Sequence, residues 1–181
     1  SKIITISLSS QNDLRRFGLS NIEIIPMSID LTPVAILETK PSGLSLAFLG
    51  RLVPGKRALD ALTAFALVKK SVLGARLTIV GRGTAEYQNL LEERIKELEI
   101  SDGVDLVRNA TDGQRNEILK RSHLIIVPSI KEGWGLTVTE AASQGTPAVV
   151  YNVDGLRDSV RDGVTGLVCV KNIPGELARL I

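Results

Sequence analysis

The sequence predicts an α/β fold in which helices cover both faces of a doubly wound, parallel sheet of six strands. From Ser45 onward, short apolar runs alternate with longer amphipathic runs, and most of the short runs are apolar on both faces. Strands of this kind are typical of parallel sheets that are buried between helices. With 181 residues, 44% of them apolar, the chain is long enough for one well-buried domain and a small appendage.

The predicted elements alternate regularly along this part of the chain. Strands are expected at Ser45–Gly50, Arg76–Val80, Val104–Val107, Leu124–Val127, Pro147–Tyr151 and Gly166–Val170. Helices are expected at Ala58–Ser71, Thr84–Glu99, Asp112–Arg121, Thr137–Gln144, Gly155–Arg161 and Pro174–Ile181. Ligands of such sheets bind at the carboxyl ends of the strands, near the switch in strand order. Because the last helix has only about two turns, we expect the domain to be truncated there.

A smaller unit precedes the alternating series. It consists of a predicted strand at Ile3–Leu8, a helix at Asp13–Phe17 capped by Ser9 or Ser10, and a strand at Ile22–Pro26. Met27–Gly43 contains prolines and lacks apolar periodicity, which predicts a linker. We therefore divide the chain into residues 1–43 and a main domain, residues 44–181. Both ends of the chain indicate a piece of a larger protein.

Charge and cysteine content exclude several kinds of function. The formal net charge is +2 and no basic run is interleaved with aromatic residues, so nucleic acid is not an expected partner. Cys169 is the only cysteine, which leaves no disulfide framework and no cysteine-based metal site. A reducing, cytoplasmic setting fits best. No apolar run approaches the ~18 residues needed to cross a bilayer, so the chain is expected to be soluble.

The first loop with chemical character follows the predicted strand Ser45–Gly50 and reads G-R-L-V-P-G-K-R. It places Arg51 and Lys56 just before a helix, where the helix dipole disfavours cations unless an anion lies between them. An arginine fork and a lysine ammonium together suit a diphosphate. A solvated surface turn is an equally good interpretation of this loop taken by itself.

The second loop, Gly81–Glu86, reads G-R-G-T-A-E and also joins a strand to a helix. It begins like a dinucleotide-binding fingerprint, but Glu86 stands where the third glycine belongs. We therefore favour a tight turn whose glycines adopt positive φ angles.

The third stretch, Pro128–Pro147, follows the predicted strand Leu124–Val127. Its glycine-rich loop leads into a short helix, whose free backbone N–H groups suit an anionic ligand. Two carboxylates, Glu132 and Glu140, are expected beside that ligand.

Two residues of this stretch also have purely structural interpretations. Thr137 and Glu140 have the spacing of a capping box, in which Glu140 would only return a hydrogen bond to the start of its helix. Trp134 is at least as well explained as a packing residue. Glu132 meets no obvious local need between a strand end and a glycine-rich loop, which favours a role in ligand binding.

The sequence E-G-W-G-L-T-V-T-E, Glu132–Glu140, resembles the paired-glutamate motif of retaining, nucleotide-sugar-dependent glycosyltransferases of the family 4 (glycosyl transferases group 1) type. Gly50–Lys56 is similar to the family's phosphate-binding loop, Leu77–Gly83 to its next strand and turn, and Asp154–Val168 to its closing region. The N-terminal S-S-Q-N-D-L-R-R-F-G and I-E-I-I-P-M-S-I-D resemble the end of the acceptor-side domain and the linker. The resemblance implies the Rossmann-like, donor-binding C-terminal half of a GT-B fold.

The resemblance also implies a role for each loop. Arg51 and Lys56 would hold the donor diphosphate and offset charge on the leaving group, so that no metal or other cofactor is needed. Glu132 would face the transferred sugar, and Glu140 would accept hydrogen bonds from the ribose. Arg51, Lys56 and Glu132 are the predicted catalytic residues, and the remaining donor-binding residues are Gly50, Gly81, Arg108, Asn109, Gly133, Trp134, Gly135, Leu136 and Glu140. Within this set, Arg108 and Asn109 would contact the base, and the N–H groups of Gly135 and Leu136 would cap the diphosphate.

Four positions differ from the family's usual pattern. Trp134 replaces the more common Phe, Arg57 stands where Gly often follows the lysine, and Asp154 replaces the first of two glycines. His123 occupies a position that is usually acidic, and we expect its role to be structural.

The partners implied are a nucleotide-sugar donor and an acceptor domain that precedes this chain. Peripheral membrane contact through that domain would place the full-length protein at the inner membrane surface. Without that domain we expect weak donor binding and little turnover.

Two other functions stay open: a GT-B protein of different chemistry, such as a nucleotide-sugar epimerase, and a non-catalytic Rossmann-like interaction module. The sequence alone identifies neither the base, among UDP, GDP and ADP, nor the sugar, the acceptor or the oligomeric state.

Overall fold

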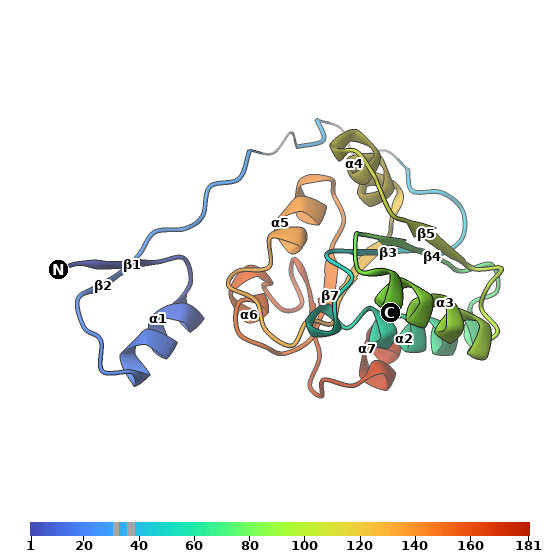
Figure 1. The fold of residues 1–181 in the computed structure, drawn as a ribbon. Helices are drawn as coiled ribbons and strands as arrows, with labels where there is room; N and C mark the ends of the chain where they lie inside the picture. Colours follow the sequence, from blue (N-terminus) through green and yellow to red (C-terminus); the bar gives the residue numbers. More distant parts are fainter. Residues whose placement is uncertain (31–32, 36–38) are drawn as a thin grey trace.

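Six parallel strands form the main sheet of the computed structural model, which describes residues 1–30, 33–35 and 39–181 (Figure 1). The strands lie in the order β5, β4, β3, β6, β7, β8. Their bounds are β3 Ser45–Leu49, β4 Arg76–Val80, β5 Val104–Val107, β6 Leu124–Val127, β7 Ala148–Val150 and β8 Gly166–Val168. The predicted α/β class and six-stranded sheet are confirmed, although β7 and β8 are shorter than predicted.

Helices cover both faces of this sheet. One face carries α2 (Ala58–Ser71), α3 (Ala85–Glu97) and α7 (Pro174–Leu180), and the other carries α4 (Asp112–Arg121), α5 (Leu136–Ser143) and α6 (Leu156–Ser159). Alternate residues of each strand enter the two cores. In β3, Leu46 and Phe48 pack toward α2, whereas Ala47 and Leu49 face the opposite core. Burial on both sides explains why most of the strand sequences have no polar face.

The strand order reverses between β3 and β6. The chain proceeds outward from β3 through β4 to β5, and β6 then returns to the other side of β3. The two strands are joined near their start by His123, whose Nδ1 accepts a hydrogen bond from the Ser45 N–H at 3.1 Å. His123 is therefore structural, as expected. Connections diverge at such a reversal and leave a crevice at the carboxyl ends of the strands.

The N-terminal unit contains β1 (Ile3–Thr5), α1 (Leu8–Arg16) and β2 (Ile22–Ile24), with the two strands paired in parallel. The prediction that this helix starts at Asp13 after Ser9 or Ser10 is wrong. Ser7 is the cap, and its Oγ accepts a hydrogen bond from the Ser10 N–H at 3.1 Å. Because this cap lies so early, β1 ends at Thr5 and α1 gains more than a turn.

Residues 27–43 connect this unit to the main sheet. Part of the predicted linker, residues 31–32 and 36–38, lies outside the described residues. Lys40 anchors the described end of the linker, donating hydrogen bonds to the Lys120 carbonyl oxygen at 2.8 Å and to Thr146 Oγ1 at 2.9 Å. The domain boundary at residue 43 stays a prediction. Across the described ranges, none of the helices combines the length and apolar character that a membrane span requires.

Candidate functional site

Three cavities lie along the crevice at the carboxyl ends of the strands. The α5 cavity, of about 360 Å³, lies among the loops after β3, β4 and β5 and the helices α4 and α5. The α1 cavity, of about 310 Å³, lies between the loops after β3 and β6 and is bordered by Ser10 of α1. The Trp134 cavity, of about 240 Å³, extends from Trp134 to Ile6 and Met27 of the N-terminal segment.

The loop after β3 carries Arg51 and Lys56 to the crevice. Hydrogen bonds to the neighbouring β4 loop hold its beginning, from the Gly50 N–H to the Val80 oxygen at 3.0 Å and from the Leu52 N–H to the Arg82 oxygen at 2.7 Å. A short 3₁₀ turn, η1 (Pro54–Lys56), then leads into α2. Arg51 is exposed and lines both the α5 cavity and the α1 cavity.

The glycines of the loop after β4 are needed for close packing. The prediction of positive φ angles is wrong, because neither Gly81 nor Gly83 lies in that region. A Cβ atom on Gly81 would lie 1.9 Å from the Gly50 oxygen, and one on Gly83 would lie 2.3 Å from the Leu52 oxygen. Both glycines therefore let the first and second loops approach closely at the mouth of the crevice.

The loop after β6 turns sharply into α5 at Gly135, which has a φ of 88° and is the residue before the helix. The helix begins at Leu136, so the capping box of Thr137 and Glu140 does not form, and no side chain among the described residues caps this helix. Trp134 donates from Nε1 to Thr139 Oγ1 at 3.0 Å and also lines its cavity. The N–H groups of Leu136 and Thr137 have no hydrogen-bond partner in the part of the chain that the structure describes, and are thus left available beside the cavities.

Glu132 and Lys56 form an ion pair that joins the first and third loops. The Glu132 N–H donates to the Asp154 carbonyl oxygen at 3.2 Å, which fixes its backbone. Gly155, the next residue of the same turn, lies so close that a Cβ atom there would be 2.2 Å from the Glu132 oxygen. The second glycine of the Asp154-Gly155 pair therefore allows the turn after β7 to support the Glu132 loop.

Glu140 lies one turn into α5 and lines the α5 cavity together with Thr137. Burial raises the pKa of its carboxyl, against a smaller lowering effect of Arg115 and a further raising effect of Asp112. No described residue forms a hydrogen bond or ion pair with this carboxylate. It is thus a partly buried acceptor that is open to a ligand in the cavity.

The far end of the α5 cavity is rich in arginine. Arg108 lines it and forms an ion pair with Glu92, whereas Asn109 is exposed and is not among the lining residues. Arg82 also lines the cavity, and its guanidinium has no ion-pair or hydrogen-bond partner among the described residues. The sequence interpretation missed Arg82, although it lies between two glycines at a strand end, a pattern that could have indicated it.

Comparison with known proteins identifies the family. The family model described as Glycosyl transferases group 1 matches residues 35–181. The chain belongs to this family.

Two curated relatives of this glycosyltransferase chain show how much of a full-length protein it represents. Glycogen synthase of Mycobacterium tuberculosis is 29% identical over 99% of the chain and 44% of its own length. D-inositol 3-phosphate glycosyltransferase of Segniliparus rotundus is 32% identical over 81% of the chain and 35% of its own length. The chain therefore spans less than half the length of these curated relatives.

Solved structures agree on the fold. Sucrose-phosphate synthase of Thermosynechococcus elongatus matches with a TM-score of 0.83 and 23% identity, over 98% of this chain and 47% of that one. Anabaena HepE in complex with UDP and glucose matches with a TM-score of 0.78 and 20% identity, over 99% of this chain and 52% of that one. The predicted family and GT-B fold are confirmed. The roles of the individual site residues stay predictions.

Proposed function

We propose that this glycosyltransferase chain binds the nucleoside-diphosphate sugar from which the full-length enzyme transfers the sugar to an acceptor with retention of configuration. The structure of HepE with UDP and glucose, which shares this fold, supports a donor of that class. The acceptor would be bound by a domain outside this chain, through which the enzyme would contact the inner membrane surface.

One observation carries the proposal: the cavities meet at the residues suited to a diphosphate. Arg51 borders both the α5 cavity and the α1 cavity, and Thr137 of the first turn of α5 borders both the α5 cavity and the Trp134 cavity. A ligand that extends from the α5 cavity into the α1 cavity passes the Arg51 guanidinium, and one that extends into the Trp134 cavity passes the N-terminus of α5. Both favour a negative charge.

The remaining residues assign the two ends of the donor. The Glu140 carboxylate accepts hydrogen bonds from the ribose hydroxyls in the α5 cavity, and the base extends toward Arg82 and Arg108. On the other side, Lys56 and Glu132 lie at the α1 and Trp134 cavities, where the sugar binds. Arg51 and Lys56 supply the positive charge that stabilises the departing diphosphate.

Neither glutamate acts as a nucleophile in this proposal. The Glu132 carboxylate is already held by Lys56, which suits orientation of the sugar. The departing phosphate takes the proton of the acceptor, so that bond formation and cleavage occur on the same face of the sugar. The positive charge of Arg51 and Lys56 takes the place of a metal ion, and no resident cofactor is needed.

Titration calorimetry of this chain with UDP, GDP and ADP, in the presence of EDTA, tests the proposal. At least one diphosphate should bind, and Arg51→Ala or Lys56→Ala should weaken it by about 1.5–3 kcal/mol, the range for a charge-assisted contact. Matched controls are Arg161→Ala and Lys70→Ala, which remove exposed cations outside the cavity linings. No binding at millimolar ligand, or equal effects of site and control variants, would overturn it.

A further inference from the structure

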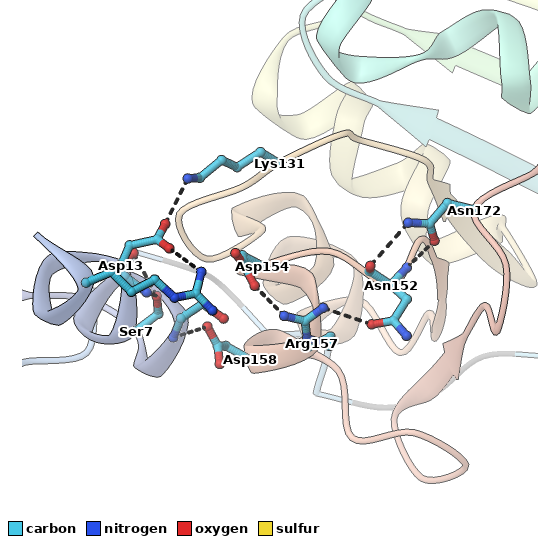
Figure 2. Close-up of polar contacts among 11 residues, drawn as sticks. Ser7, Asp13, Lys131, Asn152, Asp154, Arg157, Asp158 and Asn172 are labelled. Carbon is cyan, nitrogen blue, oxygen red and sulfur yellow. Dashed lines mark hydrogen bonds and ion pairs between the residues drawn. The ribbon is translucent and has the colours of Figure 1, made fainter.

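The helix α1 of the N-terminal unit contacts the loop that carries Glu132 (Figure 2). Asp13 on α1 forms an ion pair with Lys131, the residue before Glu132, at 2.9 Å. The neighbouring Ile6 approaches Gly133, the residue after Glu132, so closely that a Cβ on that glycine would lie 3.2 Å from Ile6 Cδ1. The residues on both sides of Glu132 therefore contact the N-terminal unit.

A second polar contact holds the start of α1. The first turn of this fully described helix carries no acidic side chain that would complement its N-terminal dipole. Asp158 of α6 supplies the charge from outside, because its Oδ2 accepts a hydrogen bond from the Ser9 N–H at 3.1 Å. Helix α1 thus has a carboxylate at its N-terminus that belongs to the main domain.

On the opposite side, the Glu132 loop rests on the turn after β7. Besides the bond from the Glu132 N–H to the Asp154 oxygen, the Asp154 carboxylate pairs with Arg157. Arg157 also donates to Asn152 Oδ1 at 3.0 Å, and the Asn152 N–H donates to Asn172 Oδ1 at 2.7 Å, as Figure 2 shows. The loop is consequently held between this fixed turn and α1.

The N-terminal unit also contributes to the cavities themselves. Ser10 borders the α1 cavity, and Ile6 and Met27 border the Trp134 cavity. The α5 cavity is lined by no residue of this unit and by none of the described linker residues 27–30, 33–35 and 39–43. Movement of α1 would therefore change the space around Lys56 and Glu132 and leave the cavity around Glu140 as it is.

We propose that Asp13 and Asp158 are positioning residues, which hold α1 against the Glu132 loop and thereby fix the sugar side of the donor site. This inference rests on the proposed function, because the ligand of the Glu132 loop is the donor sugar proposed above. The contacts of Asp13 and Asp158 between the N-terminal unit and the main domain thus set the position of Glu132. The nucleoside side forms independently of α1.

Hydrogen exchange of this chain tests the positioning without any ligand. Asp13→Asn, Lys131→Gln and the double variant should each raise exchange in residues 130–134 by the same factor, about two- to fivefold for an exposed ion pair. Equal effects are expected because either single change already breaks the pair. Asp158→Ala should raise exchange in residues 8–11. The control Asp102→Asn breaks the Lys69–Asp102 pair at the opposite end of the sheet and should leave the loop unchanged.

Nucleotide binding then tests the selectivity. The probes are UDP-glucose, GDP-mannose and ADP-glucose, each paired with its own diphosphate. For the pair that binds, the Asp13 and Lys131 variants should weaken the nucleotide sugar about two- to fivefold and the diphosphate by less, because the diphosphate lies partly beside the α5 cavity. Unchanged loop exchange, additive effects of the two single variants, or equal weakening of both probes would overturn the inference. If no probe binds while the exchange results hold, the proposed function fails and the positioning by α1 stands.

Discussion

The Lys56 ammonium and the Glu132 carboxylate form an ion pair across the crevice, between the loop after β3 and the loop after β6. Both side chains are largely shielded, with 23% and 14% of their surfaces exposed. Each is therefore the counter-ion that makes the other's partial burial acceptable. A donor phosphate that uses Lys56 must compete with Glu132 for the ammonium.

The ion pair should contribute to stability. Lys56→Met leaves the shielded Glu132 carboxylate without its counter-ion, and Glu132→Gln leaves the Lys56 ammonium with only a neutral amide beside it. Both variants should therefore lower the free energy of unfolding. The double variant should lose less unfolding free energy than the two single variants lose together. Urea denaturation should give a coupling energy of about 0.5–3 kcal/mol between the two sites. The same cycle on the exposed pair Arg76 and Asp105 should give a smaller coupling. Strict additivity at Lys56 and Glu132 would contradict the interpretation.

Removal of the Glu132 charge should also affect ligand binding. In Glu132→Gln the ammonium of Lys56 is released, so a nucleoside diphosphate without sugar should bind about two- to tenfold more tightly. A nucleotide sugar should gain less, because its sugar loses a carboxylate acceptor. Competition calorimetry with both ligands measures the difference. Weaker diphosphate binding by Glu132→Gln would show that Glu132 does not hold Lys56 away from the phosphate.

Burial of Glu140 should make stability depend on pH. Because folding raises the pKa of its carboxyl, the folded chain binds the proton more tightly than the unfolded chain. This contribution is fully present below the ordinary value of 4.5 and is lost as the pH rises through the folded-state pKa. Glu140→Gln should therefore stabilise the chain at pH 7, and exposed Glu117→Gln is the control. Denaturation between pH 4 and 7 checks both. A destabilised Glu140→Gln at pH 7 would contradict the prediction.

The sheet and most helices could be predicted because burial on both faces leaves a direct trace in the sequence. Leu46 to Leu49 read as one apolar run because alternate residues enter different cores. The start of α1 could not be found in this way. Ser7, Ser9 and Ser10 are all good caps, and the choice of Ser7 places the helix N-terminus on Asp158, about 150 residues away in sequence.

The loops containing the candidate site could also be located from sequence, but the contacts between them could not. Lys56 and Glu132 are 76 positions apart, and nothing local indicates that they pair. Gly81 illustrates the same limit. A glycine at a turn suggests a positive φ, but Gly81 does not adopt one. A glycine is required there because the oxygen of Gly50, on the adjacent loop, leaves no room for a Cβ atom, and only the three-dimensional arrangement shows this contact. Arg82 lines the α5 cavity and Asn109 does not, which likewise depends on how the loops fold and not on the local sequence.

Arg57 lies between η1 and α2 in the left-handed region, with a φ of 53°. The backbone cost of that conformation is about 1–2 kcal/mol for a residue with a Cβ. Arg57→Gly removes this cost and loses the ion pair with Asp60 at 3.3 Å, so the chain should become slightly more stable. Arg57→Ala keeps the backbone cost and loses the same pair, so it should be the least stable of the three. Urea denaturation gives the order of stability of the three chains. If Arg57→Gly were less stable than the unchanged chain, the ion pair with Asp60 would contribute more than the backbone cost at residue 57.

Gly155 should be required for the position of Glu132. Gly155→Ala combines a φ of 81° with a Cβ placed 2.2 Å from the Glu132 oxygen. Gly163→Ala has a φ of 72° and nothing within 4 Å of its Cβ, so it bears only the backbone cost of about 1–2 kcal/mol. Gly155→Ala should lose more stability than this control and should weaken a nucleotide sugar more than its diphosphate, because the Glu132 carboxylate moves with its backbone. Denaturation and calorimetry of both variants decide the point, since equal losses would mean that the loop adapts without displacing Glu132.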